Sequence, residues 1–163
     1  MNKKALLIIM ILAIISIMAV FAINTSNQDF DGHFTMEVPF GKHYSDVAYC
    51  LPSGGLGCKC EYWEDNAGCD IEDGDIVVYY YNNSLLSEGE SNAFEHAING
   101  LTTSYFYQAH QDGNLIILTN DLEMRAMPPY LAGKSTDDGD GVVFVGGRNL
   151  NDVKRYANSI EFR

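Results

Sequence analysis

Four cysteines lie within 20 residues of one another and are the side chains with the clearest chemical potential: Cys50, Cys58, Cys60 and Cys69. In an extracytoplasmic protein, an even number of closely spaced cysteines predicts two disulfides. Cys58 and Cys60 are two residues apart, so on a strand they share one face and each is expected to pair with a different cysteine. Three connectivities remain open.

The same four thiols have two other possible uses. Four thiolates can bind zinc, but the spacing C-x7-C-x-C-x8-C lacks the C-x2-C pairs typical of zinc sites, and no metal is expected. Alternatively, Lys59 between Cys58 and Cys60 would favour the thiolate form and thus thiol-redox chemistry. The segment lacks the strand-to-helix setting usual for redox motifs.

The common catalytic and phosphate-binding motifs are absent from the sequence. Gly133-Lys134-Ser135 matches the end of a phosphate-binding loop, but the glycine required five residues earlier is Pro128, which has no N–H to donate. No serine lies in G-x-S-x-G, and no H-E-x-x-H motif includes any of the histidines, His33, His43, His96 and His110. The sequence therefore assigns no catalytic residue and no cofactor.

Two acidic segments, Asp70–Asp75 and Asp137–Asp140, contain the oxygen ligands that calcium prefers. Neither has the EF-hand spacing, and the position that would supply the closing glutamate of the second is Gly147. Aspartate and glycine are also the residues favoured in hairpin turns. We expect both segments to be turns.

The net charge of the chain limits the classes of partner that it is expected to bind. There are 22 acidic and 10 basic residues, and two of the basic residues, Lys3 and Lys4, precede a long apolar segment. The rest of the chain is strongly negative and would repel phosphate backbones, so nucleic acid is not expected as a partner.

The apolar segment Ala5–Ile23 contains a single polar residue, Ser16. Its 19 residues roughly match a hydrocarbon core of about 30 Å if they form a helix. With Lys3 and Lys4 on one side and acidic residues on the other, the positive-inside rule predicts a single-pass membrane protein with its C-terminal domain outside the cytoplasm. The alternative is a secreted protein, cleaved near Ala22.

The predicted organisation has four parts. They are a cytoplasmic N-terminus (1–4), a transmembrane anchor or signal segment (5–23), a polar juxtamembrane linker (24–31) and an extracytoplasmic domain (32–163).

Hydrophobic periodicity predicts the elements of this domain. Strands are expected at His33–Val38, Cys58–Glu64, Ile76–Tyr81, Thr102–Gln111, Asn114–Thr119, Tyr130–Lys134 and Val142–Val145. The run Ile76–Tyr81, IVVYYY, has no polar face and predicts a strand covered on both sides. Asp112-Gly113 predicts a two-residue hairpin turn.

Two amphipathic helices are also predicted. The first has a capping box of Ser87 and Glu90 and an apolar stripe at Ala93, Phe94, Ala97, Ile98 and Leu101. The second has apolar residues at Leu150, Val153, Ala157 and Ile160 and a cap at Asn149 or Asn151. The expected fold is α+β, a largely antiparallel sheet with both helices packed on it.

The sequences at the two ends of the domain resemble those of other proteins. Phe30–Pro39 (FDGHFTMEVP) and Val142–Phe162 resemble the ends of small, membrane-anchored archaeal proteins that are uncharacterised. A first strand ending in Val-Pro and a last helix running into Ser-Ile-x-Phe is loosely similar to the Mog1/PsbP-like fold. That resemblance implies a non-catalytic binding or assembly protein.

Aromatic residues supply the remaining candidate surface: Tyr44, Tyr49, Tyr62, Trp63, Tyr79, Tyr80, Tyr81, Tyr105, Phe106 and Tyr107. They could fill the two layers around a sheet or form an exposed face that binds a protein or carbohydrate. We therefore expect a membrane-anchored, non-catalytic domain that binds a partner at the cell surface. The alternative is a thiol-redox or metal-binding module. The oligomeric state is left open.

Overall fold

The computed structural model describes residues 25–30, 32–39, 44–50, 58–63, 76–83, 92–122 and 127–163. The predicted anchor 5–23, Ser87, Cys69 and the acidic segment 70–75 lie outside these residues. None of the helices in the described part of the chain has the length and apolar character needed to span a bilayer.

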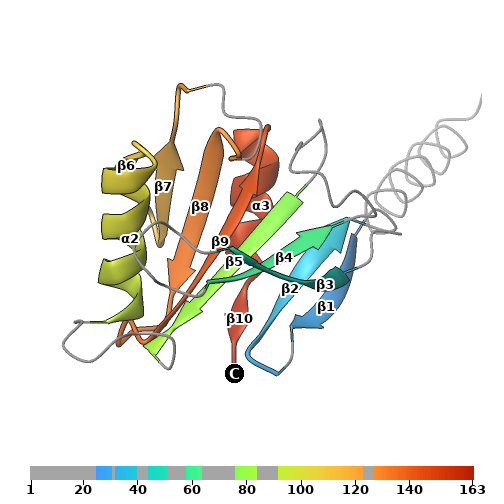
Figure 1. The fold of residues 1–163 in the computed structure, drawn as a ribbon. Coiled ribbons are helices and arrows are strands. Elements are labelled where there is room, and N and C mark those ends of the chain that lie inside the picture. The colour runs from blue at the N-terminus through green and yellow to red at the C-terminus, as the bar shows by residue number, and fades with distance from the viewer. Residues whose placement is uncertain are drawn as a thin grey trace, which may run out of the picture.

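The described strands form two antiparallel sheets (Figure 1). The smaller sheet has the order β1–β2–β10, with β1 at Thr25–Phe30, β2 at Phe34–Pro39 and β10 at Glu161–Phe162. The larger sheet has the order β3–β4–β5–β9–β8–β7–β6. Its strands are β3 (Tyr44–Cys50), β4 (Cys58–Trp63), β5 (Ile76–Asn82), β6 (Gln108–Asp112), β7 (Leu115–Thr119), β8 (Tyr130–Ser135) and β9 (Gly141–Gly147).

Two helices cover opposite faces of the larger sheet. Helix α2 (Ala93–Ser104) shares a buried cluster with Val77, Tyr79 and other residues on one face. Helix α3 (Leu150–Asn158) and the smaller sheet share a second cluster with Ile76 and Val78 on the other face. Figure 1 shows this layering. The α+β class with antiparallel pairing and two packed helices is confirmed, although there are two sheets instead of one.

The central position of β5 follows from its composition. IVVYYY alternates between the two clusters, so each face of the strand supplies apolar side chains to a different layer. Strand β5 pairs with β4 on one side and β9 on the other, and β8 pairs with β9 across residues 136–140. A strand without a polar face requires a place in the interior of a sheet.

Several local predictions differ from the structure. Residues 25–30, within the expected linker, form β1. Helix α2 is capped by Asn92 rather than by Ser87, and it continues to Ser104, so the strand predicted from Thr102 begins only at Gln108.

The hairpin turn consists of Gly113 and Asn114, one residue later than predicted. Gly113 has a φ of 61°, as expected for the first turn residue of a type II′ hairpin.

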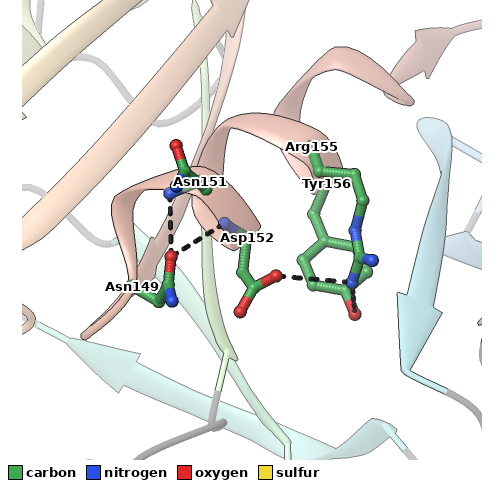
Figure 2. Close-up of polar contacts among 5 residues, drawn as sticks. All are labelled: Asn149, Asn151, Asp152, Arg155 and Tyr156. Carbon is green, nitrogen blue, oxygen red and sulfur yellow. Dashed lines mark hydrogen bonds and ion pairs between the residues drawn. The ribbon is translucent and has the colours of Figure 1, made fainter.

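The cap of α3 explains how this helix begins. The Asn149 side chain accepts hydrogen bonds from the N–H groups of Asn151 (2.9 Å) and Asp152 (3.3 Å), as Figure 2 shows. In the first turn, Asp152 Oδ1 lies 3.7 Å from Arg155 Nη2. The same Arg155 nitrogen donates a hydrogen bond to the Tyr156 hydroxyl at 2.6 Å. Of the two predicted caps, Asn149 is the correct one. These contacts among residues 149–156 stabilise the first turns of α3.

Candidate functional site

The structure places two of the four cysteines directly opposite each other. In the antiparallel pair β3–β4, the Cα of Cys50 lies across from that of Cys58. Cys60 lies across from Ala48 on one side and Tyr79 on the other. Directly opposed residues of antiparallel strands have Cα atoms about 4.5–5.5 Å apart, which is within the range that a disulfide spans.

This register predicts one of the three connectivities. We expect Cys50 to pair with Cys58, which leaves Cys60 for Cys69, because residues opposite Cys60 on both neighbouring strands are not cysteines. Peptide mapping of the non-reduced protein should recover a cross-linked peptide pair containing Cys50 and Cys58. Recovery of Cys50 linked to Cys60, or of four free thiols, would contradict the prediction.

The residues that match the end of a phosphate-binding loop, and a second glycine in the neighbouring strand, have structural roles. Gly133 and Lys134 lie inside β8, where the Lys134 Nζ donates to the carbonyl of Ile160 at 2.5 Å. Gly146 lies inside β9, and a Cβ built there would be 2.5 Å from Pro128 Cγ. Close packing of backbone against side chains therefore accounts for these glycines.

In the described part of the chain, the histidines and acidic residues do not form a cluster. His33, His96 and His110 are on the β1–β2 turn, α2 and β6, and His43 lies outside the described residues. Within the described ranges, no three His, Cys, Asp or Glu residues are grouped so as to hold a metal ion.

The second acidic segment is a turn, and two of its carboxylates, those of Asp138 and Asp140, have hydrogen-bonding partners. Asp138 accepts hydrogen bonds from the Thr136 hydroxyl at 2.7 Å and from the Asp140 N–H at 3.0 Å, and these hold the pKa of its carboxyl below the usual range. Asp140 accepts a hydrogen bond from the Asn83 side chain. The carbonyl of Gly139 in this turn accepts from the Phe94 N–H, so the turn helps to fix the start of α2.

Most of the described aromatic side chains fill the core. Tyr79, Tyr81 and Tyr107 are buried on the α2 side of the sheet, and Tyr80 packs against the opposite cluster. Phe106 differs, because its side chain is 66% exposed. Among the described residues, the other exposed large hydrophobic side chain is Leu122, at 51%.

The backbone of Phe106 is as unusual as its exposure. Its φ of 59° is the one positive φ among the described non-glycine residues. A bulky residue rarely adopts this left-handed conformation, which costs about 1–3 kcal/mol. The conformation follows the last turn of α2, whose C-terminal cap is Tyr105. Strained backbone conformations cluster at functional sites, and the exposed apolar ring at the same residue makes Phe106 a candidate binding residue.

A buried amide holds Phe106 and Leu122 in place. The side chain of Asn120, only 6% exposed, donates to the Tyr105 carbonyl at 2.7 Å and accepts from the Leu122 N–H at 2.7 Å. The Asn120 N–H donates to the Pro129 carbonyl at 2.9 Å. The Asn120 side chain thus links Tyr105, the residue before Phe106, to Leu122.

Tyr107 fixes the chain on the other side of Phe106. Its N–H donates to the Leu101 carbonyl at 3.2 Å, and its buried hydroxyl donates to the Pro128 carbonyl at 2.5 Å. Burial raises the pKa of the Tyr107 hydroxyl far above its usual value, so it remains a donor at every physiological pH. With both neighbours fixed, the Phe106 ring is held outward. We call Tyr105, Phe106, Tyr107, Asn120 and Leu122 the Phe106 corner.

The sequence alone gave no reason to separate Phe106 from its aromatic neighbours. A strand over Thr102–Gln111, as expected, would place Phe106 and Tyr107 on opposite faces of the sheet, because successive side chains of a strand alternate. The signal that could have identified the corner is Asn120, a polar residue directly after the apolar β7, but its partner is 15 residues earlier in the chain.

Comparisons of the chain with protein-family models, with curated protein sequences and with solved structures found no match.

Proposed function

We propose that this chain is a non-catalytic binding protein that is held at the cell surface by residues 5–23 and engages a protein partner through the Phe106 corner. The observation that supports binding is the fixed outward position of Phe106. Burying a phenylalanine contributes about 1.5–3 kcal/mol, so a ring held in solvent by a strained backbone forgoes stability that a partner would restore.

The rigidity of the corner supports the same proposal. Binding is weakened when side chains and loops must be ordered at the interface, and a ring whose backbone is already fixed on both sides avoids much of this cost. Aromatic anchors of this kind dominate the energy of protein interfaces.

The experiment is site-specific photo-crosslinking in the organism's own membranes. A photoreactive phenylalanine analogue at position 106 of the full chain should give a discrete adduct with a protein. The same analogue at Asn158, an exposed residue on α3, serves as the matched control and should give little or none. Equal labelling at both positions, or no adduct at position 106, would refute a binding role for the corner.

A second variant tests whether the strained conformation matters. Phe106→Gly removes the ring and relieves the backbone, so it should leave the fold intact or more stable while abolishing binding to the cross-linked partner. Thermal unfolding measures the first effect, and binding of the purified partner measures the second. A variant that binds as well as the parent would show that the ring does not contact the partner.

A further inference from the structure

Strand β6 forms one edge of the larger sheet, and in the described part of the chain it lacks the features that usually protect an edge. It pairs with β7, and no other described strand lies on its outer side. All five of its side chains, Gln-Ala-His-Gln-Asp, are exposed. Natural edge strands are commonly blocked by lysine, proline, a bulge or a covering segment. Strand β6 contains neither of these residues, and its pairing with β7 is regular along its whole length.

The edge is also electrically balanced within a strongly acidic chain. The single acidic residue of β6 is Asp112, and it forms an ion pair with Lys154 of α3. The Lys154 hydrogen bond and charge lower the pKa of the Asp112 carboxyl, so the pair persists at neutral pH. At this edge, two copies of the chain can approach with less repulsion than their overall charge would cause.

The register of the β6–β7 hairpin shows which backbone groups face outward. Gly113 and Asn114 form a two-residue turn, so Asp112 and Leu115 make a hydrogen-bonded pair. Hydrogen-bonded and non-hydrogen-bonded pairs alternate along an antiparallel ladder. His110 therefore bonds to β7, whereas Ala109 and Gln111 direct their N–H and C=O groups away from the sheet.

We propose that β6 pairs with β6 of a second copy, antiparallel and centred on His110, so that the two larger sheets join across a two-fold axis. This inference rests on the proposed function, because it names a second copy as the protein that the Phe106 region engages. In this register, Ala109 of each copy lies opposite Gln111 of the other. Every outward-facing backbone group of the two residues then finds a partner. Registers centred on Ala109 or Gln111 would leave some of these groups unpaired.

The neighbouring residues fit the same arrangement. In this register, Gln108 of one copy lies opposite Asp112 of the other, so Phe106, two residues before Gln108, lies near the β6–β7 turn of the other copy. That turn is exposed, and the space beside Gly113 is open, with no atom within 4 Å of the position of a Cβ. The Phe106 ring would cover the turn of the second copy, and the interface is repeated twice by symmetry, as in most homodimers.

The test compares the oligomeric state of the purified full chain with that of three variants, by sedimentation in one detergent. Ala109→Pro removes an outward N–H without removing a bond to β7, and edge strands accept proline where the N–H faces solvent. Ala109→Thr keeps the N–H and is the matched control. The wild type and Ala109→Thr should be dimers, and Ala109→Pro should dissociate with a dissociation constant raised about tenfold or more.

A third variant keeps the proposal testable if Ala109→Pro does not fold. His110→Asp places two carboxylates opposite each other on the two-fold axis, at a position exposed in the single chain, and should also give monomers. A monomeric wild type, or variants that remain dimeric, would overturn the proposal. If the wild type is a monomer but position 106 still cross-links to a different protein, the proposed binding function stands and self-pairing is excluded.

Discussion

Val78→Asp is expected to unfold the domain. Val78 is 1% exposed in the middle of β5, within the cluster that α3 and the smaller sheet share with the larger sheet. Its Cα neighbours are Glu61 in β4 and Val145 in β9, so the strand is paired on both sides. A carboxyl group there would be removed from water without a hydrogen-bonding partner. The free energy of unfolding should fall by about 4 kcal/mol or more, a large part of the total for a domain of this size.

Thermal and urea unfolding of the variant, compared with the parent, measure this effect. Ser26→Asp introduces the same side chain at an exposed position of β1 and should change the free energy of unfolding by about 0.5 kcal/mol or less. Val78→Ala should fall between the two, since it removes buried methyl groups without adding a polar group. A melting temperature for Val78→Asp close to that of the parent would mean that β5 lies at an exposed edge.

The interior of the fold was predictable because its signals are local and repeated. An apolar run without a polar face, IVVYYY, requires an interior strand, and apolar residues at helical spacing around Val153 require a helix on the sheet. Strands β8 and β9 both lie where strands are expected, and only a short polar turn separates them. Each of these features is specified by residues that lie close together in the sequence.

The ends of α2 were not predictable, since distant residues determine them. Ser87-x-x-Glu90 and Asn92-x-x-Glu95 are both capping sequences by spacing. The observed helix begins after Asn92 because Asn83 accepts from the Ala93 N–H at 2.8 Å and the Gly139 carbonyl accepts from the Phe94 N–H at 3.1 Å. Gly139 belongs to a turn more than 40 residues later in the chain.

The first strand, β1, was also not predictable from its own sequence, because distant residues hold it in the sheet. Strand β1 is polar and does not alternate, so its sequence resembles a linker. Its place in the sheet is fixed by stacking of Phe30 on Phe34, with ring centroids 4.6 Å apart, and by an ion pair between Asp29 and the C-terminal Arg163. The candidate site depends on distant residues in a similar way, because the exposure of Phe106 results from the hydrogen bonds of Asn120.

Gly133→Ala is expected to have the second large effect on stability. Gly133 lies in β8 opposite Phe144 of β9, and the Phe144 ring occupies the space that a side chain would need. A Cβ at this position would be 2.4 Å from Phe144 Cε1 and 2.8 Å from Ile116 Cγ2. Phe144 is fully buried and cannot move aside without displacing its neighbours. One added methyl group should therefore lower the free energy of unfolding by about 1–3 kcal/mol.

Gly100→Ala is the matched control, because it makes the same change where the structure has room. Nothing lies within 4 Å of a Cβ at Gly100, which is in the interior of α2, so this variant should be more stable by about 0.5–1 kcal/mol. Phe144→Leu then tests the cause. If the clash is with the ring, Gly133→Ala should cost less in the Phe144→Leu background than in the parent, and urea unfolding of the four proteins measures this coupling. Strictly additive effects would show that the strain at Gly133 arises from the backbone or from Ile116, and not from Phe144.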